Sequence, residues 1–298
     1  MTRRVRRAAL TGRLLIGVLQ LWLLPGLCAR AAAQTPIFRA EVDAVEVDVA
    51  VMRGGQPVRG LRPDQFRLTD NGTPQTVQVT PLADLPLHIV LALDTSSSVR
   101  GERLERLITA GLGLAEALRP DDQIALVTFG HDVRMPVLMS PPGEPLRRAL
   151  SALGGGGPTA LRDAVQLSFG LHAARKSRAL VLLFSDGTDT ASWTTNEALA
   201  DAARRTNSVL QVVRFDVIPD SRPTYLDGLA LTTGGRTWAA TSDADLEKLF
   251  TRALNEMRAR YLLTYTPSGE QKKGWHDIRV DVRNARGDVT ARRGYVVP

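Results

Sequence analysis

The hydrophobic pattern changes twice along the chain, and each change marks a different kind of secondary structure. Every second residue from Val45 to Val51 is valine, which is the period of a half-buried β-strand. The run 88–93 is almost continuously apolar, which is typical of a strand buried on both faces of a parallel sheet. Apolar and charged residues alternate again from Ile278 to Val282. The pattern predicts a central α/β region between two β-rich flanks.

The central region alternates apolar strands with helical stretches. Strands are predicted at 88–93, 123–129, 133–138, 179–184 and 209–215. Helices are predicted at 102–118, 144–152, 160–174, 194–206 and 243–259. Such alternation is typical of a doubly wound, mostly parallel sheet, so the predicted fold class is α/β.

The two flanks are too short to fold well alone. The first carries a strong turn signal at Asp70-Asn71-Gly72 between short β patterns. We expect the flanks to pair into one small sheet or sandwich beside the α/β domain. Two separate β segments, the alternative, would leave strand edges with unpaired backbone groups. The predicted domains are an N-terminal β segment (35–84), the α/β domain (85–260) and a C-terminal β segment (261–298) that packs with the first.

The first 34 residues have the features of an export signal. A basic start, MTRRVRR, precedes an apolar run from Leu14 to Leu27 and a small-residue stretch with an A-x-A cleavage site. The run is shorter than the about 20 residues that span a bilayer comfortably. We expect residues 1–34 to be a signal peptide and the protein to be periplasmic or extracellular. A retained signal is the alternative and the only predicted membrane contact; lipidation of Cys28 is disfavoured because Leu27 is not small.

The formal net charge of +7 comes mostly from this signal. Six arginines lie in the first 34 residues, which carry no acid, so 32 of the 38 basic residues remain against 31 acidic ones. Charge therefore gives no support to a nucleic-acid partner.

Five side chains with oxygen ligands lie in three distant segments. They are Asp94, Ser96, Ser98, Thr159 and Asp186. Asp94 and Asp186 follow apolar strands, and ligands of open α/β sheets bind at the carboxyl ends of strands, so we expect the three loops to meet at one edge. Two carboxylates and three hydroxyls suit a hard divalent cation, Mg²⁺ first, with Mn²⁺ or Ca²⁺ as alternatives. A coordination position stays open for an acidic group of a partner.

The spacing Asp-x-Ser-x-Ser is weak evidence by itself, because aspartate and serine also cap helices. More weight comes from the buried strands before Asp94 and Asp186 and from the glycine run 154–157 before Thr159. Glycine lets a loop adopt positive φ and approach an ion closely. A flexible linker between two helices is the alternative interpretation of that run.

The region from about 86 to 260 resembles the von Willebrand factor A domain, a Rossmann-like fold. The resemblance implies that the five residues form the family's metal-ion-dependent adhesion site, with no catalytic residues and no organic cofactor. It also implies a protein partner that presents an Asp or Glu to the metal. In some relatives the last helix, here about 243–259, shifts when such a ligand binds.

The flanks resemble a von Willebrand factor A-related family common in acidobacteria. The matching stretches are GLRPDQFRLTDNGTPQ before the domain, YLLTYTP after it, and the closing residues 292–295. The resemblance covers most of the chain after the signal and implies a metal-dependent binding module.

Several neighbours of the five residues allow two interpretations. Thr188 and Asp189 either orient Asp186 or cap a turn. Trp193 either lies on the binding rim or packs inside the protein, and Asp163 either forms hydrogen bonds near the site or faces solvent. The four histidines show no metal-ligand spacing.

A metal-dependent, phosphatase-like hydrolase is the main alternative function. Phosphatases of the haloacid dehalogenase type carry D-x-D after the first strand, and Ser96 takes the second acidic position here. No G-x-S-x-G elbow is present, and Pro158-Thr159 does not complete a phosphate loop. The sequence favours a non-enzymatic binding (adhesion or scaffold) module; a structural subunit with a non-functional metal site is the third alternative.

Overall fold

The computed structural model describes residues 44–173, 179–215, 224–240, 242, 245–268, 272–283 and 287–297. All of them fall in one compact unit. The predicted signal and Cys28 lie outside the described residues. Among the residues described, none of the helices is both long and apolar enough to cross a bilayer.

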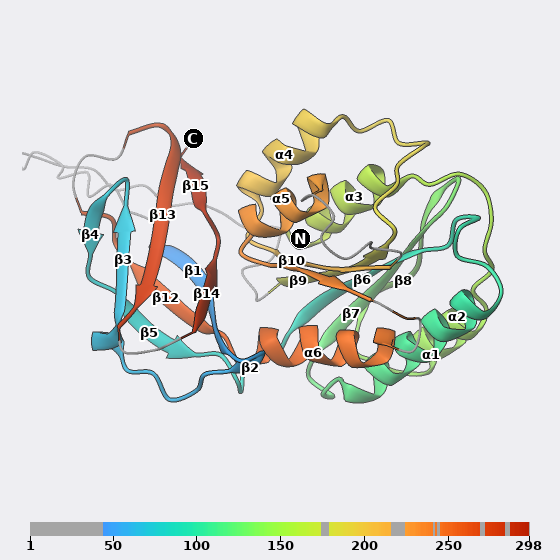
Figure 1. Ribbon diagram of the computed structural model, residues 1–298, viewed down its shortest axis with the longest axis horizontal. Coiled ribbons are helices and arrows are strands. Elements are labelled where there is room, and N and C mark those ends of the chain that lie inside the picture. The colour runs from blue at the N-terminus through green and yellow to red at the C-terminus, as the bar shows by residue number, and fades with distance from the viewer. Residues whose placement is uncertain are drawn as a thin grey trace, which may run out of the picture. The chain divides into compact units, whose positions relative to one another are not determined.

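A six-stranded sheet forms the middle layer of the α/β region, with strand order β11-β10-β9-β6-β7-β8 (Figure 1). Its strands are β6 His88–Asp94, β7 Gln123–Phe129, β8 Val133–Ser140, β9 Ala179–Ser185, β10 Val209–Arg214 and β11 Thr237–Ala239. Within the described strands of this sheet, only β8 runs antiparallel to its neighbour. The predicted fold class, α/β with a doubly wound and mostly parallel sheet, is confirmed.

Helices cover both faces of this sheet (Figure 1). They are α1 Glu102–Ala117, α2 Glu144–Ser151, α3 Leu161–Ala173, α4 Asn196–Arg205, α5 Tyr225–Thr232 and α6 Leu246–Arg258. Leu91 and Leu93 of β6 join the core beneath α1, α2 and α6. Val90 and Ala92 join the core beneath α3, α4 and α5. Both faces of β6 are therefore buried, which explains its unbroken apolar run.

The sequence did not predict α5 and β11. The strand β11 has three residues and pairs with β10 at the edge of the sheet. The helix α5 has eight residues, including Gly228 and Thr232, and neither residue favours helix. Such short elements depend on packing, here through Leu226 and Leu229, more than on local pattern.

The two flanks form two antiparallel sheets. One has the order β14-β1-β12-β5 with β2 beside β1, and the other has the order β15-β13-β3-β4. Their strands are β1 Val45–Arg53, β2 Gln56–Pro57, β3 Phe66–Asp70, β4 Thr73–Gln75, β5 Gln78–Pro81, β12 Tyr261–Tyr265, β13 Gly274–Val282, β14 Asp288–Ala291 and β15 Gly294–Val297. A 3-10 turn, Pro63–Gln65, precedes β3. Each sheet contains strands from the N-terminal and the C-terminal flank, and the two sheets line one hydrophobic core. The flanks therefore form a β-sandwich, as predicted, and not two separate β segments.

The predicted turn at Asp70-Asn71-Gly72 joins β3 to β4. Asn71 has φ of 47° and Gly72 has φ of 80°. Both values lie in the left-handed region, which two-residue hairpin turns of type I′ require. Asparagine and glycine tolerate that region better than other residues, so the turn chemistry fixes this hairpin.

A polar cluster centred on Asp70 lies buried in the sandwich. The carboxylate accepts hydrogen bonds from the hydroxyls of Tyr265 at 2.9 Å and Tyr295 at 2.8 Å. Its other oxygen lies 2.9 Å from Nδ1 of His276, whose Nε2 lies 2.6 Å from the carbonyl of Lys272. Burial acts to lower the pKa of His276, but the hydrogen bonds to Lys272 and Asp70 outweigh it and raise that pKa.

We predict that this cluster makes stability depend on pH. Folding raises the pKa of His276, so the protonated histidine adds to the free energy of unfolding. This added stability is fully present below the pKa of the unfolded chain, about 6.5, and is lost as pH rises through the higher pKa of the folded protein. His276→Gln should therefore reduce the free energy of unfolding more at pH of about 6 than at about 9, as urea denaturation would measure. The control His131→Gln, at an exposed histidine, should show no such trend. If His276→Gln lowers the free energy of unfolding equally at both pH values, the prediction is contradicted.

Buried charges fix the C-terminal end of α6. The Glu256 carboxylate lies 3.0 Å from Arg260 and 2.9 Å from Arg236, and it accepts a hydrogen bond of 2.8 Å from Gln211. Arg260 is 1% exposed and also donates to the carbonyl of Gly234. These contacts tie the last helix to the sheet at the point where the chain enters the sandwich.

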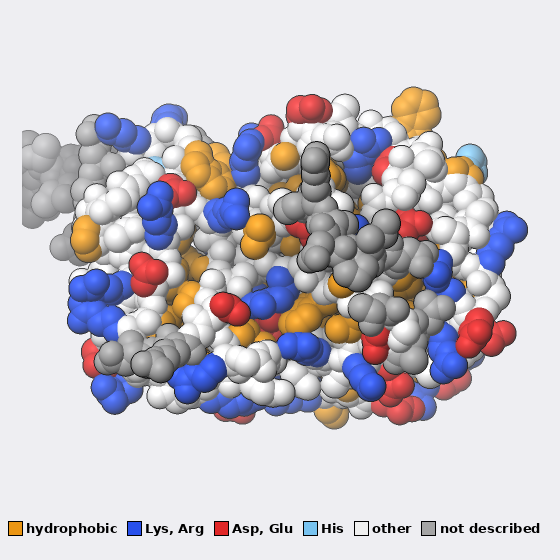
Figure 2. Space-filling model, in the orientation of Figure 1, with side chains coloured by type: hydrophobic (Ala, Val, Ile, Leu, Met, Phe, Trp, Pro, Cys, Tyr) orange, Lys and Arg blue, Asp and Glu red, His pale blue; other side chains and the backbone are white. Residues whose placement is uncertain are grey.

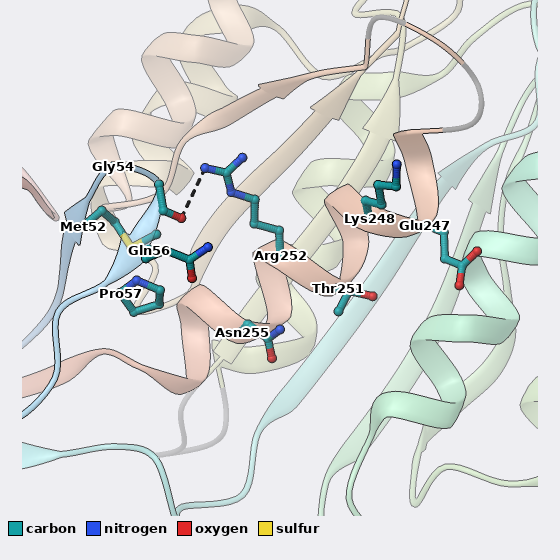
Figure 3. Close-up of a pocket in the computed structure, with 10 residues that line it drawn as sticks. Met52, Gly54, Gln56, Pro57, Glu247, Lys248, Thr251, Arg252 and Asn255 are labelled. Carbon is teal, nitrogen blue, oxygen red and sulfur yellow. Dashed lines mark hydrogen bonds between the residues drawn. The ribbon is translucent and has the colours of Figure 1, made fainter.

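A cavity of about 670 Å³ lies between α6 and the turn joining β1 to β2 (Figure 3). Arg252 reaches across it and donates to the carbonyl of Gly55 at 3.3 Å. The guanidinium of Arg252 also lies 4.7 Å from the ring centre of Trp238. Among the described residues that line the cavity, Glu247 alone is a carboxylate, and it points away from Arg252 in Figure 3.

Candidate metal centre at the carboxyl edge of the sheet

Asp94 and Asp186 lie at the point where the strand order reverses. The strand β6 has β7 on one side and β9 on the other, although the chain visits β7 first. In the parallel register of β6 and β9, Leu93 lies opposite Phe184. Asp94 at the end of β6 and Asp186 just after β9 therefore come to the same edge. Ligands of open α/β sheets bind at such a reversal.

The carboxylate of Asp94 is fully buried and held on both oxygens. It accepts hydrogen bonds from the backbone N–H of Ser96 at 2.9 Å and from the hydroxyl of Ser185 at 2.7 Å. Burial raises the pKa of Asp94; the hydrogen bonds from Ser96 and Ser185 oppose the rise, and the nearby charge of Asp186 adds to it. A buried negative charge beside a second one is an environment that a cation would stabilise.

The first loop brings two hydroxyls together after Asp94. The Oγ atoms of Ser96 and Ser98 are 3.1 Å apart; Ser96 is buried and Ser98 is exposed. The loop is joined to the glycine run, because Ser97 N–H donates to the carbonyl of Gly157 at 3.0 Å and Gly157 N–H donates to Oγ of Ser97 at 2.9 Å.

Close approach to neighbouring loops explains the glycine run better than linker flexibility does. Gly157 has φ of 86°, in the left-handed region. A Cβ atom at Gly155 would lie 2.7 Å from the carbonyl oxygen of Val99. A Cβ atom at Gly130, which follows β7, would lie 2.9 Å from the carbonyl oxygen of Gly156. Side chains at these positions would push the loops apart.

Thr159 joins the second loop to the third. Its side chain is buried, its backbone N–H donates to the hydroxyl of Thr190 at 2.9 Å, and its carbonyl accepts from the N–H groups of Thr190 and Ala191. Ser185 and Asp94 join the third loop to the first, and Ser97 and Gly157 join the first to the second. The structure thus brings together the three segments that carry the five predicted residues.

The structure resolves the two interpretations of Thr188 and Asp189. The N–H of Thr188 donates to Asp186 at 2.7 Å, so this turn does orient the Asp186 carboxylate. Asp189 instead caps a turn, because its carboxylate accepts from the backbone N–H of Ser192 at 3.3 Å. It also accepts from the backbone N–H of Arg162 at 2.8 Å and lies 3.0 Å from the guanidinium of that residue. Asp189 therefore fixes the third loop to the start of α3.

Asp163 forms hydrogen bonds near the site, which was one of its two predicted roles. Its carboxylate accepts from the N–H of Trp193 at 3.0 Å and of Thr194 at 2.8 Å. Burial acts to raise the pKa of Asp163, but the hydrogen bonds from Thr194 and Trp193 outweigh it and lower that pKa. The side chain of Trp193 is 94% exposed, so its interpretation as a packed residue is wrong.

Sequence reasoning missed Ser185, whose hydroxyl supports Asp94. The apolar pattern placed the end of its strand at Phe184, and β9 extends to Ser185. Its position between a buried strand and Asp186 was the available signal. In the part of the chain that the structure describes, no group of three or more His, Cys, Asp or Glu side chains could hold a metal. A cation at this edge would therefore depend on hydroxyl oxygens as well as on the two carboxylates.

Residues 89–188 match the family model of the von Willebrand factor type A domain. This chain contains a von Willebrand factor A domain. The matched stretch includes all five predicted residues of the site. It spans β6 to the start of the third loop, which are the elements that form the carboxyl edge.

Proteins similar to this von Willebrand factor A domain come from a Synechocystis strain, from Catenulispora acidiphila and from the mussel byssus. "Uncharacterized protein sll0103" of Synechocystis sp. is 30% identical over 109 residues, which are 35% of this chain and 26% of that protein. The von Willebrand factor type A structure from Catenulispora acidiphila has a TM-score of 0.52 at 14% identity and covers 78% of this chain and 72% of its own. Proximal thread matrix protein 1 of the mussel byssus, with a zinc-occupied MIDAS motif, has a TM-score of 0.50 at 15% identity. This match covers 66% of this chain and 51% of the mussel protein. At 14% and 15% identity, the similarity to these two structures shows the fold of this chain alone.

Charged side chains of both signs are scattered over the face of the molecule shown in Figure 2. Lys and Arg side chains lie among Asp and Glu side chains there, and neither sign takes the whole face. This mixture agrees with the near balance of charge outside the first 34 residues.

Proposed function

We propose that this protein is an exported, metal-dependent protein-binding module. In this proposal Asp94, Ser96, Ser98, Thr159 and Asp186 form a metal-ion-dependent adhesion site. The observation that supports it most is the closed set of hydrogen bonds that joins their three loops at the carboxyl edge. Residues 1–34 act as the export signal, and the partner is a protein and not a nucleic acid.

The donor set fits a hard divalent cation. Two carboxylates and three hydroxyls supply oxygen ligands, which Mg²⁺ prefers, with Mn²⁺ and Ca²⁺ as alternatives. The bound ion supplies positive charge that attracts an Asp or Glu of the partner. Ser185 and the N–H of Ser96 hold the Asp94 carboxylate in place, and such supporting contacts usually set the affinity of a metal site. The zinc-occupied motif of the mussel protein supports a cation at the corresponding edge.

A binding role fits the site better than phosphoryl transfer does. In a phosphatase of the haloacid dehalogenase type, Asp94 would be the nucleophile. The position two residues later, where a phosphatase of this type needs an acid, is Ser96. We therefore assign the protein no enzymatic activity.

The proposal predicts that a divalent cation stabilises the protein. Mg²⁺ or Mn²⁺ at about 100 times its dissociation constant should add about 2.7 kcal/mol to the free energy of unfolding. For a protein of this size that corresponds to a rise in Tm of roughly 5–10 °C, which EDTA should reverse. Differential scanning fluorimetry would measure the rise, and electron paramagnetic resonance of Mn²⁺ would count bound ions. An unchanged Tm together with no bound Mn²⁺ would favour a structural subunit without a working metal site.

A further inference from the structure

Trp193 is the most exposed large hydrophobic residue that the structure describes. Its side chain is 94% exposed, whereas Trp238 is 8% exposed and Trp275 is 39% exposed. A tryptophan commonly buries about 150–250 Å² in a core or an interface. Trp193 contributes almost none of that area to the packing of the free protein, so packing gives no reason for an indole here.

The backbone around Trp193 is held firmly. Asp163 on the first turn of α3 accepts hydrogen bonds from the N–H groups of Trp193 and Thr194. The hydroxyl of Ser192 donates to Asp189 at 2.6 Å and accepts from the N–H of Asp163 at 3.2 Å. The indole is therefore presented to solvent by a fixed loop, which reduces the conformational entropy lost when a partner covers it.

The same loop carries residues of the proposed metal site. It begins at Asp186, and its Thr190 forms hydrogen bonds with the backbone of Thr159. Trp193 follows Thr190 by three positions, a separation of at most about 10 Å along the chain. A protein segment that brings a carboxylate to the ion therefore has its neighbouring residues within reach of Trp193.

The surroundings of Trp193 resemble the centre of a binding hot spot. The flanking residues Ser192, Thr194, Thr195 and Asn196 are polar and uncharged. Tyr225, the first residue of α5, is 36% exposed and lies close to them, because its hydroxyl donates to the carbonyl of Asn196 at 3.3 Å. Exposed aromatic side chains within a polar rim are typical of interface hot spots.

We propose that Trp193 is a specificity-determining anchor of this site. The partner is a protein segment that carries an aliphatic or aromatic side chain within a few residues of the carboxylate that reaches the metal, and this side chain packs on the indole. The inference rests on the proposed metal-dependent binding function. It goes further because it states which acidic segments bind.

The test uses a displayed library of peptides with one fixed Asp and random neighbours. Selection on the purified protein in Mg²⁺ should enrich apolar residues within about four positions of the Asp. Trp193→Ala should weaken the enriched peptides at least about thirtyfold, which is the loss expected at a hot spot. Mn²⁺ affinity and far-ultraviolet circular dichroism should not change. Trp275→Ala, which removes an exposed indole from β13, is the matched control and should bind the peptides as the wild type does.

Each other result overturns a defined part of the proposal. Enrichment that requires Mg²⁺ but shows no apolar preference, or equal binding by Trp193→Ala, would reject the anchor and leave metal-dependent binding intact. Failure of the wild type to bind Mn²⁺, or enrichment that EDTA does not abolish, would reject the proposed function itself and the anchor with it. A wild type that binds Mn²⁺ and yet enriches no peptide would also reject the anchor.

Discussion

Asp94→Asn is expected to abolish the rise in Tm with Mg²⁺ and to weaken metal binding at least about 100-fold. The substitution keeps the size of the side chain and removes one of the two carboxylate charges of the proposed metal site. Removing a supporting contact of a metal ligand commonly costs 10–100-fold in affinity, so losing a charged ligand should cost at least the upper value. Calorimetric titration with Mn²⁺ and scanning fluorimetry with Mg²⁺ would measure both effects.

Asp132→Asn is the matched control for this experiment. Asp132 is an exposed carboxylate in the loop after β7, and its carbonyl accepts the N–H of Gly130, whose own carbonyl accepts the N–H of Ala160. The control removes a charge near the same edge but not from the proposed ligands. Equal metal responses of Asp94→Asn and Asp132→Asn would show that Asp94 is not a ligand.

Glu256→Ala is expected to destabilise the protein by about 3–5 kcal/mol. The substitution leaves Arg260 and Arg236 without their carboxylate, and breaking a buried ion pair from one side costs about this much. The Tm should fall by roughly 6–20 °C. Urea denaturation with a circular dichroism signal would give the free energy of unfolding.

The control for this second substitution lies on the same helix. Glu247 is exposed in the first turn of α6, so Glu247→Ala should cost less than about 1 kcal/mol. Losses of similar size for the two variants would indicate that the ion pairs of Glu256 contribute little. If the predicted cost is observed, a shift of α6 on ligand binding would have to preserve or replace these ion pairs.

The sequence predicted the α/β region well because its strands are buried on both faces. Strands such as β6 and β9 appear as unbroken apolar runs, and their length of seven residues favours a buried strand over a buried helix. Their order and direction then bring the strand ends to one edge, which allowed the convergence of Asp94 and Asp186 to be predicted.

Other features could not be predicted because distant contacts determine them. The pairing of β1 with both β12 and β14 depends on packing between segments far apart in the chain. The support of Asp94 by Ser185 depends on which strand lies beside β6. The backbone of Trp193 is held by a hydrogen bond to Asp163, 30 residues earlier, which local pattern does not reveal.

The sandwich imposes an order on the assembly of the molecule. Val45 pairs with Tyr265, and the hydroxyl of Tyr261 bonds the carbonyl of Val58, 203 residues earlier. The pairings of β1 with β12 and of β3 with β13 must therefore wait for the last part of the chain, and closing so long a loop is slow. The α/β region between them is contiguous and can fold first as the chain emerges. During that interval the early strands have unpaired edges, which gives chaperones a surface to protect.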